Sequence, residues 1–343
     1  MKNNSVLLIL TGGTISMGRN EKDSLSPLSC DEVLAMIPEL KDLNVNISSV
    51  AFSPLIDSSD INPTHWLHIC HIIKEEYHNF DGFVVLHGTD TMSYSASAVS
   101  FMLENLSKPV IFTGSQLPVG VHRSDAKENL ITSIEIASTK TDNGEAMIQE
   151  VCIYFEDQLM RGNRATKRNA EEFDAFASFN YPNLAKSGVH IKFYNEYFLE
   201  RRQDKQLIIN DKIDTNISII KLFPGITEQS VEAILNIDGL RGVILESYGT
   251  GNAPSYPWLC RQLKEATKRG ITILNISQCR AGSVEMGRYA ASLSLQEAGV
   301  LSGYDMTTEA ATTKLMFLLG KYSNPDDIKS ALEESLRGEV TIG

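Results

Sequence analysis

Three short segments place a hydroxyl-bearing residue after a glycine, and each follows an apolar run of the kind found in buried strands. They are Thr-Gly-Gly-Thr ending at Thr14, His-Gly-Thr-Asp with Thr89 and Asp90, and Thr-Gly-Ser-Gln ending at Gln116. In parallel α/β sheets, ligands bind beyond the carboxyl ends of the strands. A plain Gly-Gly turn explains the first segment equally well when it is taken alone. Three such pairs at one edge of a sheet indicate a catalytic crevice that is rich in hydroxyls.

A threonine nucleophile needs a neighbouring base, since a free hydroxyl reacts poorly near neutral pH. The segment 160–167 ends in Lys167, whose amine can serve as that base when burial or a nearby charge tunes it. Taken alone, this basic segment is more typical of a solvated loop. The glycines after the first run lack the spacing of a dinucleotide fingerprint, and neither a Walker loop nor a G-x-S-x-G elbow occurs.

Carboxylates and hydroxyls also follow the second apolar run, in the segment Asp57-Ser58-Ser59-Asp60. Two carboxylates that flank two hydroxyls can hold a small ligand carrying both an ammonium and a carboxylate group. The alternative is a cluster of N-cap residues before a helix that begins at Pro63, and for this segment alone it is the stronger interpretation.

The elements that must position these residues alternate between apolar runs and helical patterns, which predicts βαβ units and a mostly parallel sheet. In the first half we expect strands at 6–10, 45–50, 82–86, 110–113 and 151–155, and helices at 63–79, 91–104 and 125–138. The second half continues with strands at 217–222, 243–246 and 271–276, and ends with helices at 307–321 and 325–337.

A charged stretch interrupts this alternation and predicts a linker. We therefore expect an N-terminal catalytic domain over residues 1–195, a linker over 196–215 and a C-terminal domain over 216–343. The predicted fold class is α/β, with a larger, mostly parallel N-terminal sheet flanked by helices and a smaller, flavodoxin-like C-terminal α/β domain.

Composition narrows the classes of partner. The 343 residues include 31 Lys and Arg against 43 Asp and Glu, which gives a formal net charge of −12. This acidic balance argues against a nucleic-acid partner and against docking on an anionic membrane. The five widely spaced cysteines include no CxxC pair, and no apolar run approaches the roughly 20 residues of a membrane helix. We expect a cytoplasmic protein with reduced thiols.

A row of histidines invites a metal interpretation. His65, His68 and His71 are spaced by three on an expected helix, but they drift around its surface and have no acidic partner at ligand spacing. We therefore expect no metal site.

The segments that carry the hydroxyls and Lys167 resemble those of the type I, cytoplasmic L-asparaginases of bacteria, in the asparaginase/glutaminase family. The likeness continues into the segments 247–254 and 277–279 and covers nearly the whole chain. The resemblance implies hydrolysis of L-asparagine to L-aspartate and ammonia without a cofactor. Weak action on L-glutamine stays open. The resemblance also implies a homotetramer built as a dimer of dimers.

The resemblance implies a role for each matching residue. Thr14 would attack the side-chain amide and form a β-aspartyl ester, while Thr89, Asp90 and Lys167 would move protons. The Thr89 backbone N–H would stabilise the oxyanion. The substrate's ammonium and carboxylate groups would bind a set of residues that also includes Thr89 and Asp90, namely Asp57, Ser58, Ser59 and, from a neighbouring subunit, Asn252.

The chain departs from the family in the flap that follows the first threonine. Many asparaginases carry a tyrosine there that hydrogen-bonds the nucleophile, but residues 15–55 contain no tyrosine. Ser24 or Ser26 is a candidate for the missing hydroxyl, as is a tyrosine from elsewhere in the chain. We expect Ser24→Ala to change turnover little.

A second departure concerns regulation. Some type I enzymes bind a second, regulatory asparagine near the segments that match Thr166, Glu246 and Cys279, and the allosteric members have arginine where this chain has Glu246. Because a carboxylate repels the carboxylate of the ligand, the sequence predicts weak or absent activation by asparagine.

Two other functions stay open. One is an amidase subunit that supplies ammonia to a tRNA amidotransferase, although such subunits normally carry an extra N-terminal domain and Thr14 lies close to the start of this chain. The other is a catalytically silent amino-acid-binding protein of the same fold. Such a protein would not need the nucleophile and the base that Thr14 and Lys167 supply together.

Overall fold

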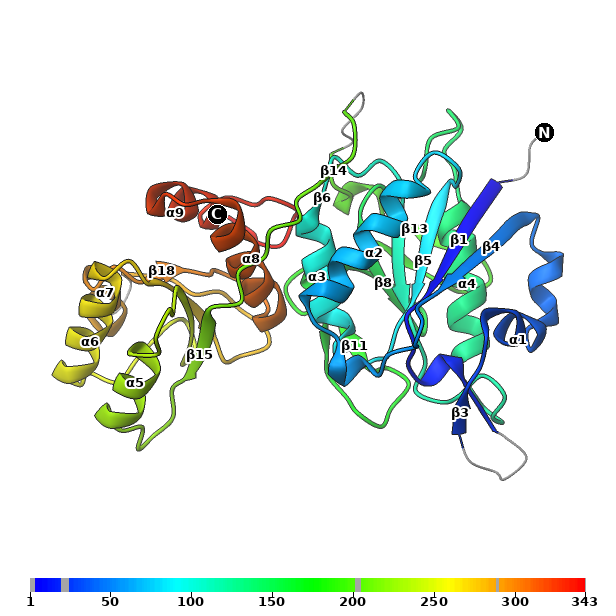
Figure 1. The fold of residues 1–343 in the computed structure, drawn as a ribbon. Helices are drawn as coiled ribbons and strands as arrows, with labels where there is room; N and C mark the ends of the chain where they lie inside the picture. Colours follow the sequence, from blue (N-terminus) through cyan, green and yellow to red (C-terminus); the bar gives the residue numbers. More distant parts are fainter. Residues whose placement is uncertain (1–3, 20–24, 201–204, 288–289, 343) are drawn as a thin grey trace. The chain divides into compact units, whose positions relative to one another are not determined.

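The chain forms two compact units that divide between Asn210 and Asp211. The computed structural model describes residues 4–19, 25–200, 205–287 and 290–342 (Figure 1). Each unit contains its own sheet, helices and core, which confirms the predicted class of two α/β domains. Part of the segment expected to be a linker, Ile208–Ile209 (β14), pairs with Leu103–Glu104 (β6) of the first unit.

The first unit is built on a mixed sheet in the order β13-β12-β9-β8-β7-β5-β1-β4. Its parallel part contains the five expected strands, namely β1 (Asn4–Leu10), β4 (Val45–Ala51), β5 (Gly82–Leu86), β7 (Val110–Thr113) and β8 (Val151–Phe155). Three antiparallel strands that the sequence did not indicate extend it, namely β9 (Gln158–Arg161), β12 (Ala185–Lys186) and β13 (Lys192–Phe193). The parallel strands all end at the same edge, as the site requires.

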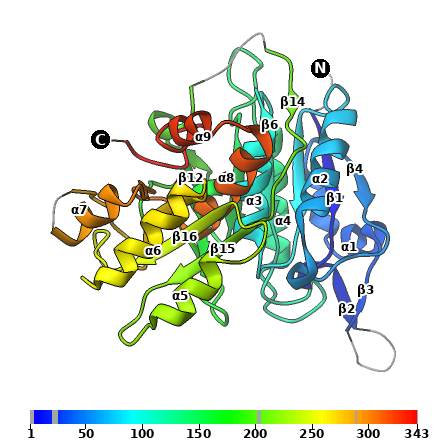
Figure 2. The same ribbon diagram turned by 60° about the vertical axis from the view of Figure 1, so that its left-hand side comes forward.

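Helices cover both faces of this sheet (Figures 1 and 2). They are α1 (Cys30–Ala35), α2 (Pro63–Glu75), α3 (Met92–Met102) and α4 (Ala126–Ser138). The start of α2 follows from its sequence. The Asn62 side chain accepts the Thr64 N–H at 3.0 Å, and Pro63 has no N–H that would need an acceptor in the first turn. The three expected helices are confirmed, although α2 and α3 end earlier than predicted.

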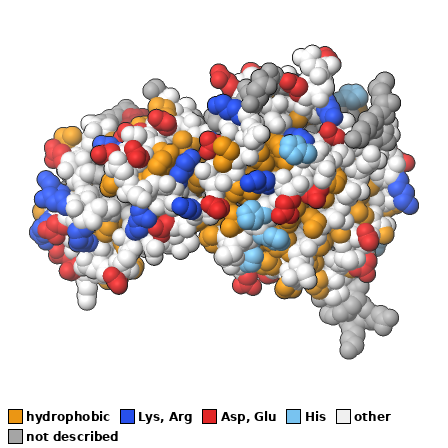
Figure 3. All heavy atoms as spheres, turned by 45° about the horizontal axis from the view of Figure 1, so that its top comes forward, with side chains coloured by type: hydrophobic (Ala, Val, Ile, Leu, Met, Phe, Trp, Pro, Cys, Tyr) orange, Lys and Arg blue, Asp and Glu red, His pale blue; other side chains and the backbone are white. Residues whose placement is uncertain are grey.

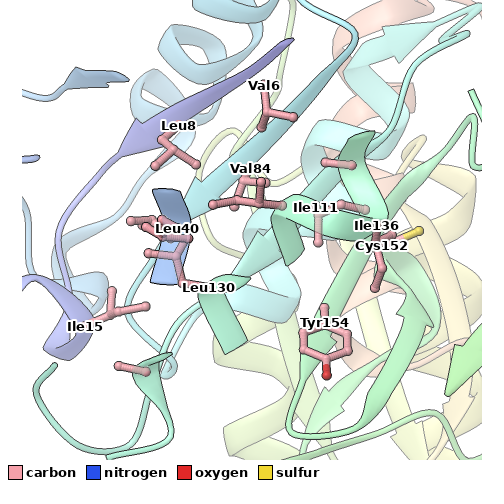
Figure 4. Close-up of a cluster of buried hydrophobic side chains, with 14 of the residues drawn as sticks. Val6, Leu8, Ile15, Leu40, Val84, Ile111, Leu130, Ile136, Cys152 and Tyr154 are labelled. Carbon is pink, nitrogen blue, oxygen red and sulfur yellow. The ribbon is translucent and has the colours of Figure 1, made fainter. Parts of the chain in front are cut away.

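The core of the first unit follows from alternation along its strands. Val6 and Leu8 of β1 lie fully buried in one cluster with α4, while Leu7 between them points to the other face. Figure 4 shows this cluster, with Val84 and Ile111 from neighbouring strands beside Val6 and Leu8. Because both faces are covered, the inner strands β5 and β8 are apolar and buried throughout, whereas the edge strand β4 alternates between apolar and polar residues.

Several short elements complete the first unit. They are the strands β2 (Met17–Arg19), β3 (Leu25–Pro27), β10 (Thr166–Lys167) and β11 (Phe176–Ala177), and the 3-10 turns η1 (Thr14–Ser16), η2 (Pro38–Asp42), η3 (Ser58–Asp60), η4 (Gly162–Arg164) and η5 (Asn195–Tyr197). Strands β2 and β3 form an antiparallel hairpin directly after η1. The expected flap therefore begins at Thr14.

The second unit has a parallel sheet of four strands, β15 (Ile217–Lys221), β16 (Gly242–Ser247), β17 (Thr272–Ser277) and β18 (Leu301–Ser302). Its helices are α5 (Glu228–Leu235), α6 (Pro257–Lys268), α7 (Ala290–Glu297), α8 (Thr308–Lys321) and α9 (Pro325–Leu332). The strands lie in chain order. The likeness to flavodoxin, whose strands are ordered 2-1-3-4-5, therefore covers the parallel α/β layers and not the strand order.

A buried ion pair holds the last described segment to α8. Lys314 Nζ lies 2.6 Å from Glu339 Oε1, and both side chains are fully buried. The same amine donates to the Glu334 carbonyl at 2.6 Å, and Glu339 accepts the Arg337 N–H at 2.7 Å. A buried charge is tolerated only with such partners, so this pair fixes where the C-terminal segment runs.

No helix among the described residues is long and apolar enough to cross a bilayer. On the face drawn in Figure 3, acidic and basic side chains are interspersed.

Candidate active site

Glycines join the loops at the carboxyl edge of the first sheet. A Cβ on Gly13, after β1, would lie 2.4 Å from the Gly88 Cα, after β5. A Cβ on Gly114, after β7, would lie 2.3 Å from the His87 carbonyl oxygen. Only glycine permits these approaches, and Gly13 also has a φ of +87° that other residues rarely adopt. The three glycine–hydroxyl segments therefore meet at one edge, as the sequence predicts.

The loop after β4 joins the same edge through Ser58. A Cβ on Gly88 would lie 2.5 Å from Ser58 Oγ, and Thr91 Oγ1 donates to the Ser58 carbonyl at 2.6 Å. Asp57 Oδ1 accepts the N–H and the hydroxyl of Ser59, both at 2.8 Å. These hydrogen bonds lower the pKa of the Asp57 carboxyl, so it is ionised at neutral pH.

Asp57 is also the N-cap of η3, whereas Asn62 caps α2. The segment therefore does not cap the helix at Pro63, as the alternative interpretation had it, and the Asp57 cap serves η3. This cap does not compete with a ligand role, because it uses one carboxylate oxygen.

A hydroxyl, an amine and a carboxylate lie in contact beside the glycines. Lys167 Nζ lies 2.8 Å from Thr89 Oγ1 and 2.7 Å from Asp90 Oδ1. Thr89 is buried, whereas most of the Asp90 side chain is exposed. Thr14 begins η1 directly after Gly13, and Thr89 directly follows Gly88. Because the two glycines are in contact, Thr14 and Thr89 lie on adjacent loops.

The segment that carries Lys167 is not a solvated loop. Only 19% of the Lys167 side chain is exposed. Just before it, η4 packs on α3, where Asn163 Nδ2 donates to Ser100 Oγ at 3.1 Å and a Cβ on Gly162 would lie 3.0 Å from the Ala96 Cβ. Small residues on α3 thus let the basic segment approach the sheet, which aims Lys167 at Thr89.

His87 is a fully buried polar residue at the end of β5. Its Nδ1 lies 2.6 Å from the Gly88 carbonyl oxygen. Burial lowers the pKa of His87 to about 4, so the imidazole is neutral near pH 7 and Nδ1 acts as the donor. The Gly88–Thr89 peptide, whose N–H we expected to serve as an oxyanion donor, is thereby held at its carbonyl.

Gln116 is a site residue to which the sequence reasoning gave no role. Thr89 Oγ1 donates to Gln116 Oε1 at 3.4 Å, and Gln116 Nε2 donates to the Glu172 carbonyl at 3.0 Å. The available signal was its place in the third glycine–hydroxyl segment, directly after Ser115.

The remaining expected site residues belong to the neighbouring strand β10, to the β2–β3 hairpin, to the second unit or to segments outside the described ranges. Thr166 precedes Lys167 on β10, but Asn252, Glu246 and Cys279 belong to the second unit. The Asn252 backbone bridges to Tyr248, and Cys279 is exposed. Ser26 lies opposite Gly18 in the β2–β3 hairpin, and Ser24 lies outside the described residues.

Glu246 already has two partners within the second unit. Its carboxylate oxygens lie 2.9 Å from Lys221 Nζ and 2.9 Å from Thr308 Oγ1. The pairing with Lys221 offsets its charge in part.

Across the described ranges, no three His, Cys, Asp or Glu side chains gather as they would around a metal ion.

Comparison with known proteins agrees along the whole chain. Residues 5–198 match the family described as "Asparaginase, N-terminal", and residues 216–332 match the "Glutaminase/Asparaginase C-terminal domain". L-asparaginase 1 of Escherichia coli (strain K12) is 42% identical over 348 residues, which cover 99% of each chain. The crystal structure of L-asparaginase I from Vibrio cholerae superposes with a TM-score of 0.90 at 38% identity, over 99% of this chain and 100% of that one.

A longer relative has a different name. A Glutamyl-tRNA(Gln) amidotransferase subunit of Pyrococcus horikoshii is 32% identical over 348 residues, which cover 98% of this chain and 76% of that protein.

The two-domain α/β fold and these matches define an amide-hydrolysing enzyme. Within that class, the chain belongs to the type I L-asparaginases of the asparaginase/glutaminase family.

Proposed function

We propose that this protein hydrolyses L-asparagine to L-aspartate and ammonia through an ester on Thr14. The observation that carries the proposal is the contact of Lys167 Nζ with Thr89 Oγ1 at 2.8 Å and Asp90 Oδ1 at 2.7 Å. It supplies a base, a hydroxyl through which a proton can pass and a carboxylate that orients the base.

In the first half of the proposed reaction, Thr14 Oγ attacks the carboxamide carbon of the substrate. The hydroxyl proton reaches the leaving nitrogen, the C–N bond breaks and ammonia departs. The product on the enzyme is a β-aspartyl ester. We assign the Thr89 backbone N–H as a donor to the oxyanion, and the hydrogen bond of His87 to the carbonyl of the same peptide unit supports this assignment.

In the second half, water attacks the ester. It gives a proton to Thr89 Oγ1 while Thr89 passes its own proton to Lys167 Nζ, so the amine must be neutral at this step. The ester bond breaks, the Lys167 ammonium returns a proton through Thr89 to the Thr14 oxygen, and aspartate leaves. Asp90 stabilises the ammonium that forms, since it lies in direct contact with the amine.

The ends of the substrate fit the loop after β4. We assign its α-ammonium to Asp57 and Asp90, and its α-carboxylate to Ser58, Ser59 and the Thr89 segment. The ionised state of Asp57 supports this division, because a carboxylate attracts an ammonium group. Asn252 is assigned to the site of a neighbouring subunit.

The test is ammonia release from L-asparagine and L-glutamine by the wild type and by Thr14→Ala and Thr89→Val. We expect release from asparagine to exceed release from glutamine, and both variants to lose activity. If the wild type releases no ammonia at millimolar asparagine, the asparaginase proposal is wrong and the amino-acid-binding function remains. Release from glutamine alone favours the ammonia-supplying amidase subunit.

We also propose a cytoplasmic homotetramer, as the resemblance to type I enzymes implies. Light scattering coupled to gel filtration measures the assembly mass, and a monomer contradicts the proposal.

A further inference from the structure

The Gln116 side chain is fixed at both ends of its amide. Its Nε2 donates to the Glu172 carbonyl at 3.0 Å, and its Oε1 accepts from Thr89 Oγ1 at 3.4 Å. A carbonyl oxygen can only accept hydrogen bonds, so the amide nitrogen must face Glu172 and the amide oxygen must face Thr89. The orientation of the amide therefore follows from its partners.

The backbone of Gln116 and the turn that contains Glu172 are both held by further hydrogen bonds. The Gln116 backbone N–H donates to the Asp125 carboxylate at 2.9 Å. The backbone N–H groups of Glu171 and Glu172 both donate to Asn169 Oδ1, at 2.8 and 3.1 Å. Gln116 thus links Thr89 to a turn that follows Lys167 by only a few residues.

The direction of the hydrogen bonds bears on the relay. Thr89 has one hydroxyl proton, and it points to Gln116 Oε1. Lys167 Nζ therefore donates to the Thr89 oxygen, and in this arrangement the amine accepts no hydrogen bond from the Thr89 hydroxyl. For Lys167 to accept a proton from Thr89, the hydroxyl must instead turn toward the amine.

We propose that Gln116 is a positioning residue of the relay, which holds the Thr89 hydroxyl away from Lys167 and so withholds the hydrogen bond that a neutral amine would accept from it. This inference rests on the proposed function. Gln116 acts through Thr89 and sets the pH at which the relay becomes active.

Charged groups from several elements surround the contact between Lys167 and Thr89, and a test must leave these groups unchanged. Asp90 pairs directly with Lys167, Arg168 pairs with Asp174 in the following turn, and Asp125 holds the Gln116 backbone from α4. The carboxylates of Asp57 and Glu172 lie on the adjoining loops, and His87 is neutral above about pH 4. None of them is altered by changing the Gln116 amide.

Two substitutions at Gln116 test the acceptor, because one keeps it and adds a charge and the other removes it. Gln116→Glu has nearly the same shape and keeps an acceptor toward Thr89, loses the donor to the Glu172 carbonyl, and adds a negative charge that favours the ammonium form of Lys167. Gln116→Met has a similar length but no acceptor, so the Thr89 hydroxyl is free to turn toward the amine.

The experiment is the pH profile of kcat/KM for asparagine between about pH 5.5 and 9.5. We expect the acidic limb to move up by about one pH unit in Gln116→Glu, which lowers kcat/KM on that limb about tenfold relative to the plateau. We expect the limb of Gln116→Met to move to lower pH. Gln229→Glu and Gln229→Met, at an exposed position of α5, are the matched controls and should keep the wild-type profile.

A uniform loss of activity with unmoved limbs, or a shift of both variants in the same direction, would overturn the inference and leave Gln116 a structural residue. If Gln116→Met does not fold, Gln116→Leu, which also lacks the acceptor, takes its place in the comparison with Gln116→Glu and the wild type. Failure of the proposed function gives a different result, because the wild type itself then releases no ammonia.

Discussion

Lys167 combines charge, burial and contact in one side chain. Its amine touches both Thr89 and Asp90, and four-fifths of the side chain is buried. Because a positioned base contributes about 10²–10⁴-fold in rate, we expect Lys167→Met to lower kcat by that factor. Ammonia release measures the loss. Lys186→Met, at an exposed position of β12, is the control, and a loss of less than threefold at Lys167 would contradict its role.

His87 makes stability depend on pH. Its pKa is lowered to about 4 in the folded protein, against about 6.5 in the unfolded chain. As the pH falls from 6.5 toward 4, the unfolded state binds a proton that the folded state does not. The free energy of unfolding therefore falls by about 3 kcal/mol across this range.

We expect His87→Asn, whose amide can replace the donor to Gly88, to remove that part of the pH dependence. Urea unfolding at about pH 7.5 and 5 measures it, with His71→Asn on the exposed side of α2 as the control. An equal loss of stability on acidification in both variants would show that His87 is not its source.

At the scale of elements, the site depends on how closely the loops after β1 and β5 approach. An alanine at Gly13 would place its Cβ 2.4 Å from the Gly88 Cα and would also strain a φ of +87°. We expect Gly13→Ala to separate Thr14 from the relay and to lower kcat/KM by at least about 10²-fold, since catalysis is sensitive to misplacement of about 1 Å.

Gly144→Ala separates strain from contact. Gly144 has a similar φ of +81°, but nothing lies within 4 Å of its Cβ position. It should cost about 1–3 kcal/mol of stability and leave kcat/KM unchanged. Equal effects of the two variants on kcat/KM would mean that the approach of the loops is unimportant.

The hairpin after η1 is the element in which the family's tyrosine is missing. We expect Ser24→Ala and Ser26→Ala each to change kcat less than threefold, because neither short hydroxyl replaces the reach of a tyrosine. Steady-state ammonia release measures both. A loss of several orders of magnitude in either variant would assign the missing hydroxyl to that serine.

The elements that the sequence located best are those with the most uniform surroundings. Strand β5 is apolar along its whole length because helices cover both of its faces, so its bounds are visible in the sequence. Strand β12 has two residues, one buried and one exposed, and only pairing with β9 makes it a strand. Two residues are too few to show a period.

The same contrast holds for the candidate site. Thr14 and Thr89 could be chosen from the sequence because a glycine beside a hydroxyl is a local pattern. The burial of Lys167 could not, because it depends on small residues of α3 that lie far away in the chain. Gln116 was missed for the same reason, since its amide is oriented by Glu172.

At the scale of the whole molecule, two of the three residues that we expected at a regulatory site, Glu246 and Cys279, belong to the second unit. Glu246 lies against Lys221 and Thr308, where a regulatory asparagine would need a cation for its carboxylate. We expect hyperbolic initial-rate curves with asparagine, with a Hill coefficient near one. Initial rates over a wide range of asparagine concentrations test this, and a sigmoidal curve would contradict it.

The pair between Lys314 and Glu339 bears on how the chain folds as it is synthesised. The contacts that define the first unit lie within residues up to 210, so this unit can fold while the rest is still being translated. Helix α8 cannot bury Lys314 at low cost until Glu339 has left the ribosome. We expect the second unit to stay open to chaperones and proteases until the segment around Glu339 has emerged.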